Sequence, residues 1–278
     1  MKRVDIVDTL VDLIKSVSSQ LPEDVLKAIR KASKQEVPGS PAASIFATIL
    51  ENCEIAAHKG VPICQDTGTL TFFINERLRR KVTPAKIKLA VAKATKLGLL
   101  RCNTIDSLTG ASIDDNCAVD APVIHYCERE GVTLILKGGG SENMSRQYSL
   151  PDAELGAGRD LEGVKKCVLD AVNKIQGYGC APGILGVCIG ADRATGYALA
   201  KEQLLRPLND HAPDRRLAKL EKDLLASANS SGIGPMGLGG KTTLLGVKLT
   251  ARTRLPASYF VTIAYMCWAC RRKTILIG

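Results

Sequence analysis

The sequence predicts a mixed α/β fold, with helices packed around short β-sheets and a helical N-terminus. Helical apolar periodicity and short strand-like runs interleave along the chain, which is typical of that class. Of the 278 residues, 45% are hydrophobic and 24% are charged, as in globular proteins and unlike disordered ones. No repeat, low-complexity tract or linker interrupts the pattern, so we expect a single domain over residues 1–278.

The first sixty residues contain only helical patterns. Apolar side chains recur at helical spacing over residues 4–18. Glu23 and Asp24 follow Pro22 and would stabilise the positive end of a second helix. A third helix is expected to begin at Ser40-Pro41 and to run towards His58.

A basic segment between residues 77 and 101 carries nine Lys or Arg residues and no acid, and accounts for most of the net charge of +10. Thr83 and Pro84 predict the start of a helix here, and Gly98 predicts its end. Its apolar stripe is expected to consist of Ile87, Ala90, Val91, Ala94 and Leu97. The lysines on the other side are either a solvated face or an anion-facing surface, and no interleaved aromatic residue indicates nucleic-acid binding.

Strand-like runs begin only after Val61 and alternate with further helical patterns. The expected strands are residues 69–74, 122–126, 132–136 and 258–266, and the expected helices are residues 161–175, 195–205 and 217–228.

The composition also limits where the protein acts. The longest uncharged stretches, 175–191 and 255–270, do not reach the continuous apolar length of a membrane span. Asp5, Asp8 and Asp12 interrupt what would be the apolar core of a secretion signal, so we expect a soluble cytoplasmic protein that binds no membrane. Ten cysteines in a reducing compartment do not predict a disulfide framework, and we expect most of them to be buried thiols.

Two short segments combine polar side chains with turn residues. Cys64, Gln65 and Asp66 are consecutive in a loop before a strand, where they need either mutual hydrogen bonds or a ligand. The segment 137–143, Lys-Gly-Gly-Gly-Ser-Glu-Asn, follows a strand, and its glycines would let backbone amides approach a carboxylate or phosphate. The alternative for the second segment is a flexible turn.

Two further glycine-rich segments, 177–190 and 229–242, are predicted to be loops. The Gly-Gly-Lys-Thr tail of the second is similar to a phosphate-binding loop, but Pro235 stands where such a loop needs glycine, and a helical pattern precedes it. Cys267 and Cys270 form one isolated CxxC pair, which is weak support for either a redox pair or half a zinc site. The three histidines, at 58, 125 and 211, do not form a catalytic set.

Taken together, these segments resemble the α subunit, or N-terminal region, of the iron–sulfur hydro-lyases, namely class I fumarate hydratase and L(+)-tartrate dehydratase. The matching segments come in the family's order and cover nearly the whole chain. They are Cys-Gln-Asp-Thr-Gly at 64–68, Lys-Gly-Gly-Gly-Ser-Glu-Asn at 137–143, Cys-Ala-Pro-Gly-Ile-Leu-Gly-Val at 180–187, Ala-Leu-Ala-Lys at 198–201, Gly-Ile-Gly-Pro-Met-Gly-Leu-Gly-Gly-Lys-Thr-Thr at 232–243 and Cys-Trp-Ala at 267–269.

The resemblance implies a [4Fe-4S] cluster held by Cys64, Cys180 and Cys267, with the fourth iron open to substrate. Such an iron acts as a Lewis acid on the carboxylate and hydroxyl of a C4 dicarboxylate such as malate. The resemblance also implies five residues that contact the substrate, which are Gln65, Asp66, Arg101, Gly139 and Gly140. Which glycine of residues 138–140 contacts substrate is left open by the resemblance.

The family's catalytic base comes from a β subunit or C-terminal domain. The present chain ends eleven residues after Cys267, so we expect a separate β-type partner that supplies the base and further carboxylate clamps. The resemblance also suggests a dimer of αβ units. The most favoured activity is the reversible hydration of fumarate to L-malate, with L(+)-tartrate dehydration as the alternative.

Departures from the family pattern keep other functions open. Leu255 stands where the family usually has a histidine proposed for proton transfer, and Cys188 and Ala191 replace glycines. A catalytically impaired, cluster-bearing scaffold is therefore a second hypothesis. A zinc-binding structural protein that uses Cys267 and Cys270 is a third.

Overall fold

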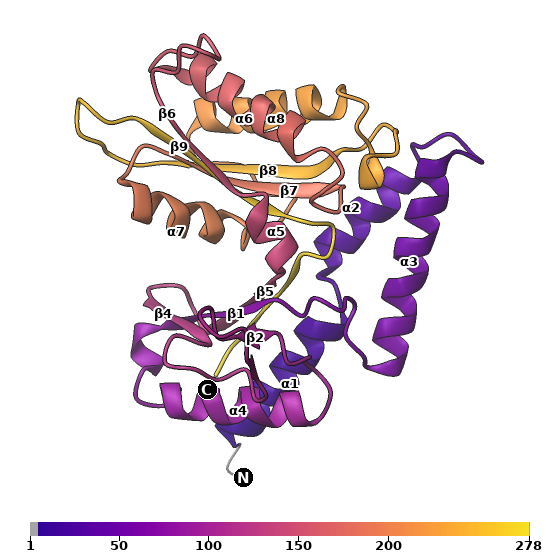
Figure 1. The fold of residues 1–278 in the computed structure, drawn as a ribbon, viewed down its shortest axis with the longest axis vertical. Coiled ribbons are helices and arrows are strands. Elements are labelled where there is room, and N and C mark those ends of the chain that lie inside the picture. The colour runs from indigo at the N-terminus through magenta and orange to yellow at the C-terminus, as the bar shows by residue number, and fades with distance from the viewer. Residues whose placement is uncertain (1–4, 278) are drawn as a thin grey trace. The chain divides into compact units, whose positions relative to one another are not determined.

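The computed structural model describes residues 5–277, and their contacts divide the chain into two compact units (Figure 1). Unit 1 contains residues 5–22, 51–139 and 269–277, and unit 2 contains residues 23–50 and 140–268. Both units combine helices with a mixed sheet, which confirms the predicted α/β class. The single catalytic domain over residues 1–278 stays a prediction.

Unit 1 is built on a four-stranded sheet in the order β10-β5-β1-β4. Strand β1 pairs in parallel with β4 and antiparallel with β5, and β10 pairs antiparallel with the other side of β5. Their bounds are β1, Thr69–Asn75; β4, Val123–Cys127; β5, Val132–Lys137; and β10, Arg271–Ile275. The C-terminal segment therefore forms one edge of this sheet.

Helices α1 (Ile6–Ser19) and α4 (Pro84–Lys96) pack against each other, and α1 also contacts β5 and β10. Asp5 caps α1 by accepting a hydrogen bond from the Val7 amide at 2.7 Å, and Thr83 caps α4. Buried aliphatic side chains of both helices join those of the sheet in one core. Unit 1 also contains the short elements η1 (Glu76–Leu78), β2 (Thr104–Ile105) and β3 (Ser112–Ile113), and the second part of α3 (Pro41–Lys59).

Unit 2 is built on a second mixed sheet, in the order β6-β9-β7-β8. Strand β7 pairs in parallel with β8 and antiparallel with β9, which in turn pairs antiparallel with β6. Their bounds are β6, Arg146–Ser149; β7, Gly183–Ile189; β8, Leu244–Ala251; and β9, Phe260–Met266. Every residue of β7 is buried, as expected for a central strand covered on both faces.

Helices cover the two faces of this sheet, with α6 and α8 on one side and α7 on the other (Figure 1). The bounds are α2, Glu23–Ser33; α5, Gly139–Asn143; α6, Leu161–Ile175; α7, Arg193–Gln203; α8, Arg215–Asn229; and the 3₁₀ turn η2, Pro235–Gly237. Asp160, Asp192 and Asp214 cap α6, α7 and α8 by accepting backbone N–H groups.

The predicted helices are confirmed to within a few residues, and α6 has the predicted bounds. Residue 4, the first of the expected helix 4–18, lies outside the described residues. The expectation that Leu97 belongs to the buried stripe of α4 was wrong, because Leu97 follows the helix and is 60% exposed. Thr95 lies buried on that face and donates from its hydroxyl to the Val91 carbonyl.

The prediction that residues 177–190 form a loop was also wrong, because Gly183–Ile189 is strand β7. Glycine is disfavoured in strands, and so the pattern concealed a strand whose glycines serve close packing. A Cβ on Gly186 would collide with the carbonyl of Ala200 in α7. Within the described residues no helix has the length and apolarity required of a membrane span.

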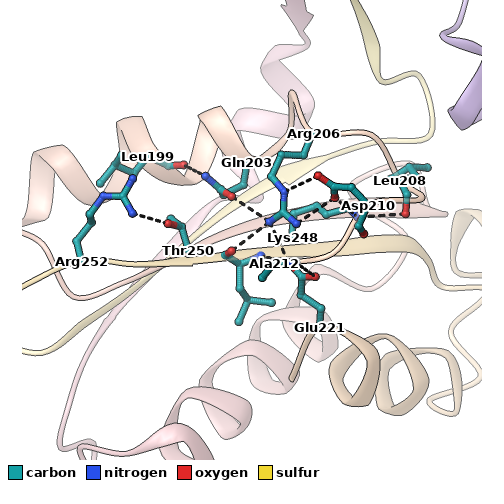
Figure 2. Close-up of polar contacts among 11 residues, drawn as sticks. Leu199, Gln203, Arg206, Leu208, Asp210, Ala212, Glu221, Lys248, Thr250 and Arg252 are labelled. Carbon is teal, nitrogen blue, oxygen red and sulfur yellow. Dashed lines mark hydrogen bonds and ion pairs between the residues drawn. The ribbon is translucent and has the colours of Figure 1, made fainter. Parts of the chain in front are cut away.

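A buried ion-pair network connects α7, α8 and β8 in unit 2 (Figure 2). Arg206, just after α7, pairs with Glu221 of α8 at 2.9 Å and with Asp210 at 3.0 Å. Lys248 of β8 pairs with Asp210 at 2.8 Å. Glu221 is 4% exposed and also accepts the amide N–H groups of Ala212 and Leu249. Each buried charge is thus matched, which offsets the cost of its desolvation.

We expect Glu221→Ala to lower the free energy of unfolding by about 3–5 kcal/mol, because it removes one of the two carboxylates paired with Arg206 and the acceptor of two buried amides. Urea unfolding measures the change. Glu23→Ala is the matched control, since the Glu23–Lys27 pair is largely exposed and its loss should cost no more than about 1 kcal/mol. Equal losses for the two variants would contradict the assigned role of the network.

Candidate active site

The Cys64-Gln65-Asp66 segment lies between α3 and β1 in unit 1 and is held by hydrogen bonds to other parts of that unit. The Cys64 thiol lies 3.6 Å from the Gln65 side-chain oxygen, and both groups are accessible. The Asp66 carboxylate accepts the side-chain amide of Asn103 at 3.4 Å. The backbone carbonyl of Asp66 accepts the Arg271 guanidinium at 2.9 Å.

Arg271 is the site's least expected member. It lies on β10 and is only 1% exposed, although it carries a full positive charge. Its Nε and one terminal nitrogen have no hydrogen-bond partner among the described residues. A buried guanidinium with N–H groups to spare is suited to an anion. Arg271 was not identified from the sequence, and the adjacent Arg271-Arg272 pair after the Cys267–Cys270 motif was the signal available for it.

Two glycines explain how the segments 64–68 and 137–143 meet. A Cβ on Gly68 would lie 2.6 Å from the backbone carbon of Lys137, and one on Gly138 would lie 2.7 Å from a carboxylate oxygen of Asp66. Both positions therefore require glycine for close approach. Gly138 is buried by this contact, whereas Gly139 and Gly140 are exposed and begin α5. The backbone of Gly138 thus packs on Asp66, and the choice between a ligand-binding segment and a flexible turn stays a prediction.

Arg101 is placed beside the same segment by its backbone. Its amide donates to the Thr67 hydroxyl at 3.3 Å, and its carbonyl accepts the Asn116 side chain at 2.8 Å. Its own side chain is exposed and can reach a ligand. Unit 1 thus brings together four predicted substrate contacts, which are Gln65, Asp66, Arg101 and Gly139.

Asn116 organises this region and was not identified from the sequence. It is 2% exposed, and its side-chain oxygen accepts the amides of Asn103 and Thr104, while its nitrogen donates to Thr95 and Arg101. Its φ of 58° lies in the left-handed region, which Asn tolerates better than most residues. The buried Asn116 side chain therefore helps Thr67 to hold the backbone of Arg101 in place.

Cys180 and Cys267 meet in unit 2. Cys180 immediately precedes the Ala181-Pro182 turn into β7, and Cys267 immediately follows β9, the strand beside β7. The amide of Trp268 donates to the Cys180 carbonyl at 3.4 Å, and the amide of Cys267 donates to the Ser141 hydroxyl at 3.2 Å. Cys180 has a φ of 53°, a conformation that a residue with a side chain adopts only where its surroundings impose it.

The ten cysteines differ in burial and in the pKa of their thiols. No disulfide joins any of them. The expectation that most are buried was wrong, because only Cys53, Cys167, Cys188 and Cys270 are. Burial raises the pKa of Cys167 and of Cys188 to about 11, so neither readily supplies the thiolate that a metal needs.

Cys180 is exposed, and Cys64 and Cys267 are half-buried, so all three thiols can reach a ligand. Thiolates are the ligands that iron–sulfur clusters prefer, and this donor set fits one. Within residues 5–277, no three His, Cys, Asp or Glu side chains are already grouped as a metal site.

The segment similar to a phosphate-binding loop is engaged within the protein. The carboxylate of Glu36 accepts the amides of Lys241 and Thr242 at 3.0–3.1 Å. Helix α8 precedes this segment, as the sequence predicted. These amides thus bind a side-chain carboxylate in place of phosphate.

The remaining features lie outside the candidate site. His58, His125 and His211 are exposed, and His125 stacks on Phe73 with ring centroids 5.0 Å apart. Leu255 is 74% exposed in the loop between β8 and β9. A hollow of about 660 Å³ in unit 2 is lined by residues of α2, α8 and β8 and by none of the predicted site residues.

The geometry therefore defines an α/β protein with accessible cysteines and, in unit 1, a buried guanidinium against a polar segment. Comparison with known proteins is consistent with this class: the fumarate hydratase (Fumerase) family model matches residues 7–276. The chain is 48% identical over 282 aligned positions to a Geobacillus stearothermophilus protein described as a class I fumarate hydratase. That match covers 97% of the chain but 54% of the relative, so the chain spans about half the relative's length.

Two relatives of similar length are described as L(+)-tartrate dehydratase subunit alpha. The one from Methanocaldococcus jannaschii is 36% identical, with 95% of each chain covered. The one from Escherichia coli K12 is 28% identical, with 94% of this chain and 87% of the relative covered. The chain belongs to the fumarate hydratase family, whose named activities add or remove water and are those of hydro-lyases. The resemblance read from the sequence is thereby confirmed.

Thiol alkylation tests the separation of the cysteines. At pH 8 we expect iodoacetamide to modify Cys180 well before Cys167 or Cys188 in the folded, metal-free chain. A thiol with a pKa of about 11 is only about one thousandth thiolate at that pH, and burial also blocks the reagent. Raising the pH towards 11 should speed the two slow sites most, as mass spectrometry of tryptic peptides would show. Equal rates for all three sites at pH 8 would contradict the assignment.

Proposed function

We propose that this chain is the α subunit of a [4Fe-4S]-dependent hydro-lyase that interconverts fumarate and L-malate together with a separate β-type subunit. The observation that carries the proposal is the grouping of Asp66, Arg101 and Gly139 beside Cys64 in unit 1 of a chain from this family. Buried Arg271 adds positive charge directly behind the segment. This arrangement favours a dianionic substrate.

Cys64, Cys180 and Cys267 would hold the cluster, and their accessibility and thiol chemistry support that assignment. When bound, the cluster supplies a Lewis-acidic iron that weakens the bond between substrate carbon and the leaving hydroxyl. The other seven cysteines, Cys270 among them, would not bind the cluster, and four of these seven are buried.

The chain's own polar groups bind and orient the substrate. The Arg101 guanidinium would bind one carboxylate with two parallel N–H donors. The backbone of the exposed residues Gly139 and Gly140 would contact carboxylate oxygens, and the Gln65 side chain would hydrogen-bond the substrate's polar groups. Asp66, fixed by Asn103, Arg271 and the close contact of Gly138, would set the position of Gln65 and Cys64.

The proton at C3 requires a base, which we assign to the β-type partner. Two relatives with the subunit-alpha description match this chain over most of their length, whereas the described class I fumarate hydratase is nearly twice as long. The subunit-alpha description of those relatives supports a two-chain enzyme, for which we propose a dimer of αβ units located in the cytoplasm. The same relatives also favour L(+)-tartrate as the second candidate substrate.

Iron content tests the ligand assignment. After anaerobic reconstitution, we expect the wild-type chain to hold about four irons and four sulfides, and Cys64→Ser, Cys180→Ser and Cys267→Ser each to lose the cluster. Cys102→Ser is the control, because Cys102 is exposed but lies outside the proposed set. Zinc in place of iron and sulfide would support the zinc-binding hypothesis. If neither the wild-type chain nor any variant bound metal, the assignment of a cluster to these cysteines would be contradicted.

Substrate binding tests Arg101. With the β-type subunit present, we expect Arg101→Lys to raise KM for fumarate and to lower kcat/KM by about 10- to 100-fold, because a lysine cannot reproduce the paired hydrogen bonds. Arg79→Lys is the control, since Arg79 forms an exposed pair with Glu76. Parallel assays with L(+)-tartrate show which acid is the substrate. A wild-type chain with cluster and partner but without activity on either acid would favour the impaired scaffold, and Leu255→His would then test the missing histidine.

A further inference from the structure

Tyr265 occupies a confined position in unit 2. It lies on β9, is 2% exposed and belongs to the main hydrophobic core of the unit. Its ring packs where the side chains of Gly179 and Gly183 would otherwise be, because a Cβ on either glycine would overlap ring atoms of Tyr265. Gly179 precedes Cys180 directly, and Tyr265 precedes Cys267 by two residues. The ring is therefore enclosed by the segments that carry both cysteines.

The hydroxyl of Tyr265 has no hydrogen-bond partner among the described residues. Burying a hydroxyl without a partner costs about 1–3 kcal/mol relative to a satisfied one. The adjoining void, which Ala181 and Thr243 also line, is too narrow to hold a water molecule that could serve as the partner. Phenylalanine would fill the same space without that cost, so the presence of a hydroxyl at this position needs an explanation.

The candidates for a partner are the sulfur atoms of the two segments that enclose the ring. Cys267 packs against the hydrophobic core that contains Tyr265. Cys180 directly follows Gly179, where a Cβ would overlap the ring. A protonated phenol is a hydrogen-bond donor, and a thiolate or sulfide is an acceptor.

We propose that the Tyr265 hydroxyl donates a hydrogen bond to a sulfur of the iron–sulfur centre, either the thiolate of Cys180 or Cys267 or a sulfide next to them. The inference rests on the proposed function, since it needs the cluster. Tyr265 is a positioning and tuning residue: it fixes the two cysteine segments through its ring and modifies the cluster through its hydroxyl. The acceptor missing from the protein alone is thereby supplied by the centre itself.

A donor aimed at a cluster sulfur stabilises the more negatively charged, reduced state and so raises the reduction potential. Removing the hydroxyl while keeping the ring should therefore lower the potential and leave the iron count unchanged. A purely structural role for the ring predicts no shift, because phenylalanine preserves the packing against Gly179 and Gly183.

The test compares the full-length chain with Tyr265→Phe after anaerobic reconstitution, using redox titration followed by electron paramagnetic resonance. We expect about four irons in both, a more negative midpoint potential for the variant and faster bleaching by oxygen. Tyr148→Phe is the matched control: the same atom is removed from the same unit, but the Tyr148 hydroxyl already donates to Asp170 at 2.7 Å. The control should lower stability and leave the potential of the cluster unchanged.

A second substitution keeps the test decisive if Tyr265→Phe misfolds. Replacement of Tyr265 alone by 3-fluorotyrosine retains the ring and hydroxyl and makes the phenol a stronger donor, so the midpoint potential should shift upward. If the wild-type chain and a folded Tyr265 variant of either kind both held the cluster and had equal midpoint potentials, the inference would be overturned. Failure of the wild-type chain to take up iron and sulfide would instead overturn the proposed function.

Discussion

The close packing of Tyr265 against Gly179 and Gly183 is the constraint on which the cysteine-bearing part of unit 2 depends. Because neither glycine leaves room for a Cβ, the turn that carries Cys180 lies directly against the end of β9. That turn holds Cys180 at a positive φ, which the surrounding contacts impose. Two cysteines far apart in the sequence are thereby brought to one place by the volume of a single ring.

Charge is handled differently in the two units. In unit 2 the charges of Arg206, Glu221 and Lys248 are largely buried and pair with one another or with half-buried Asp210, and the network supports the fold. In unit 1 the guanidinium of Arg271 is buried with only part of its hydrogen-bonding capacity used. Such an incompletely paired cation is suited to binding an anion, as the proposed function requires.

Most helices and several strands were predictable because their signals are local. Asp or Thr caps and a regular apolar stripe are enough to locate α6 or α4 from the sequence. Strand β7 was not predictable in this way, because its glycines resemble those of a turn and their purpose depends on α7, which packs against them. Leu97 similarly had the spacing of a core residue but lies beyond the end of its helix.

By itself, the sequence determined the fold class, the family and the residue types at the candidate site, since motifs and periodicity are properties of neighbouring residues. Only the tertiary structure decided that the Arg101 amide reaches Thr67 while Asn116 holds its carbonyl, that Arg271 supports Asp66, and that Tyr265 buries a hydroxyl with no hydrogen-bond partner among the described residues. Each of these depends on what surrounds a side chain after folding. Burial and hydrogen-bond satisfaction are set by residues distant in the chain, and so no local pattern encodes them.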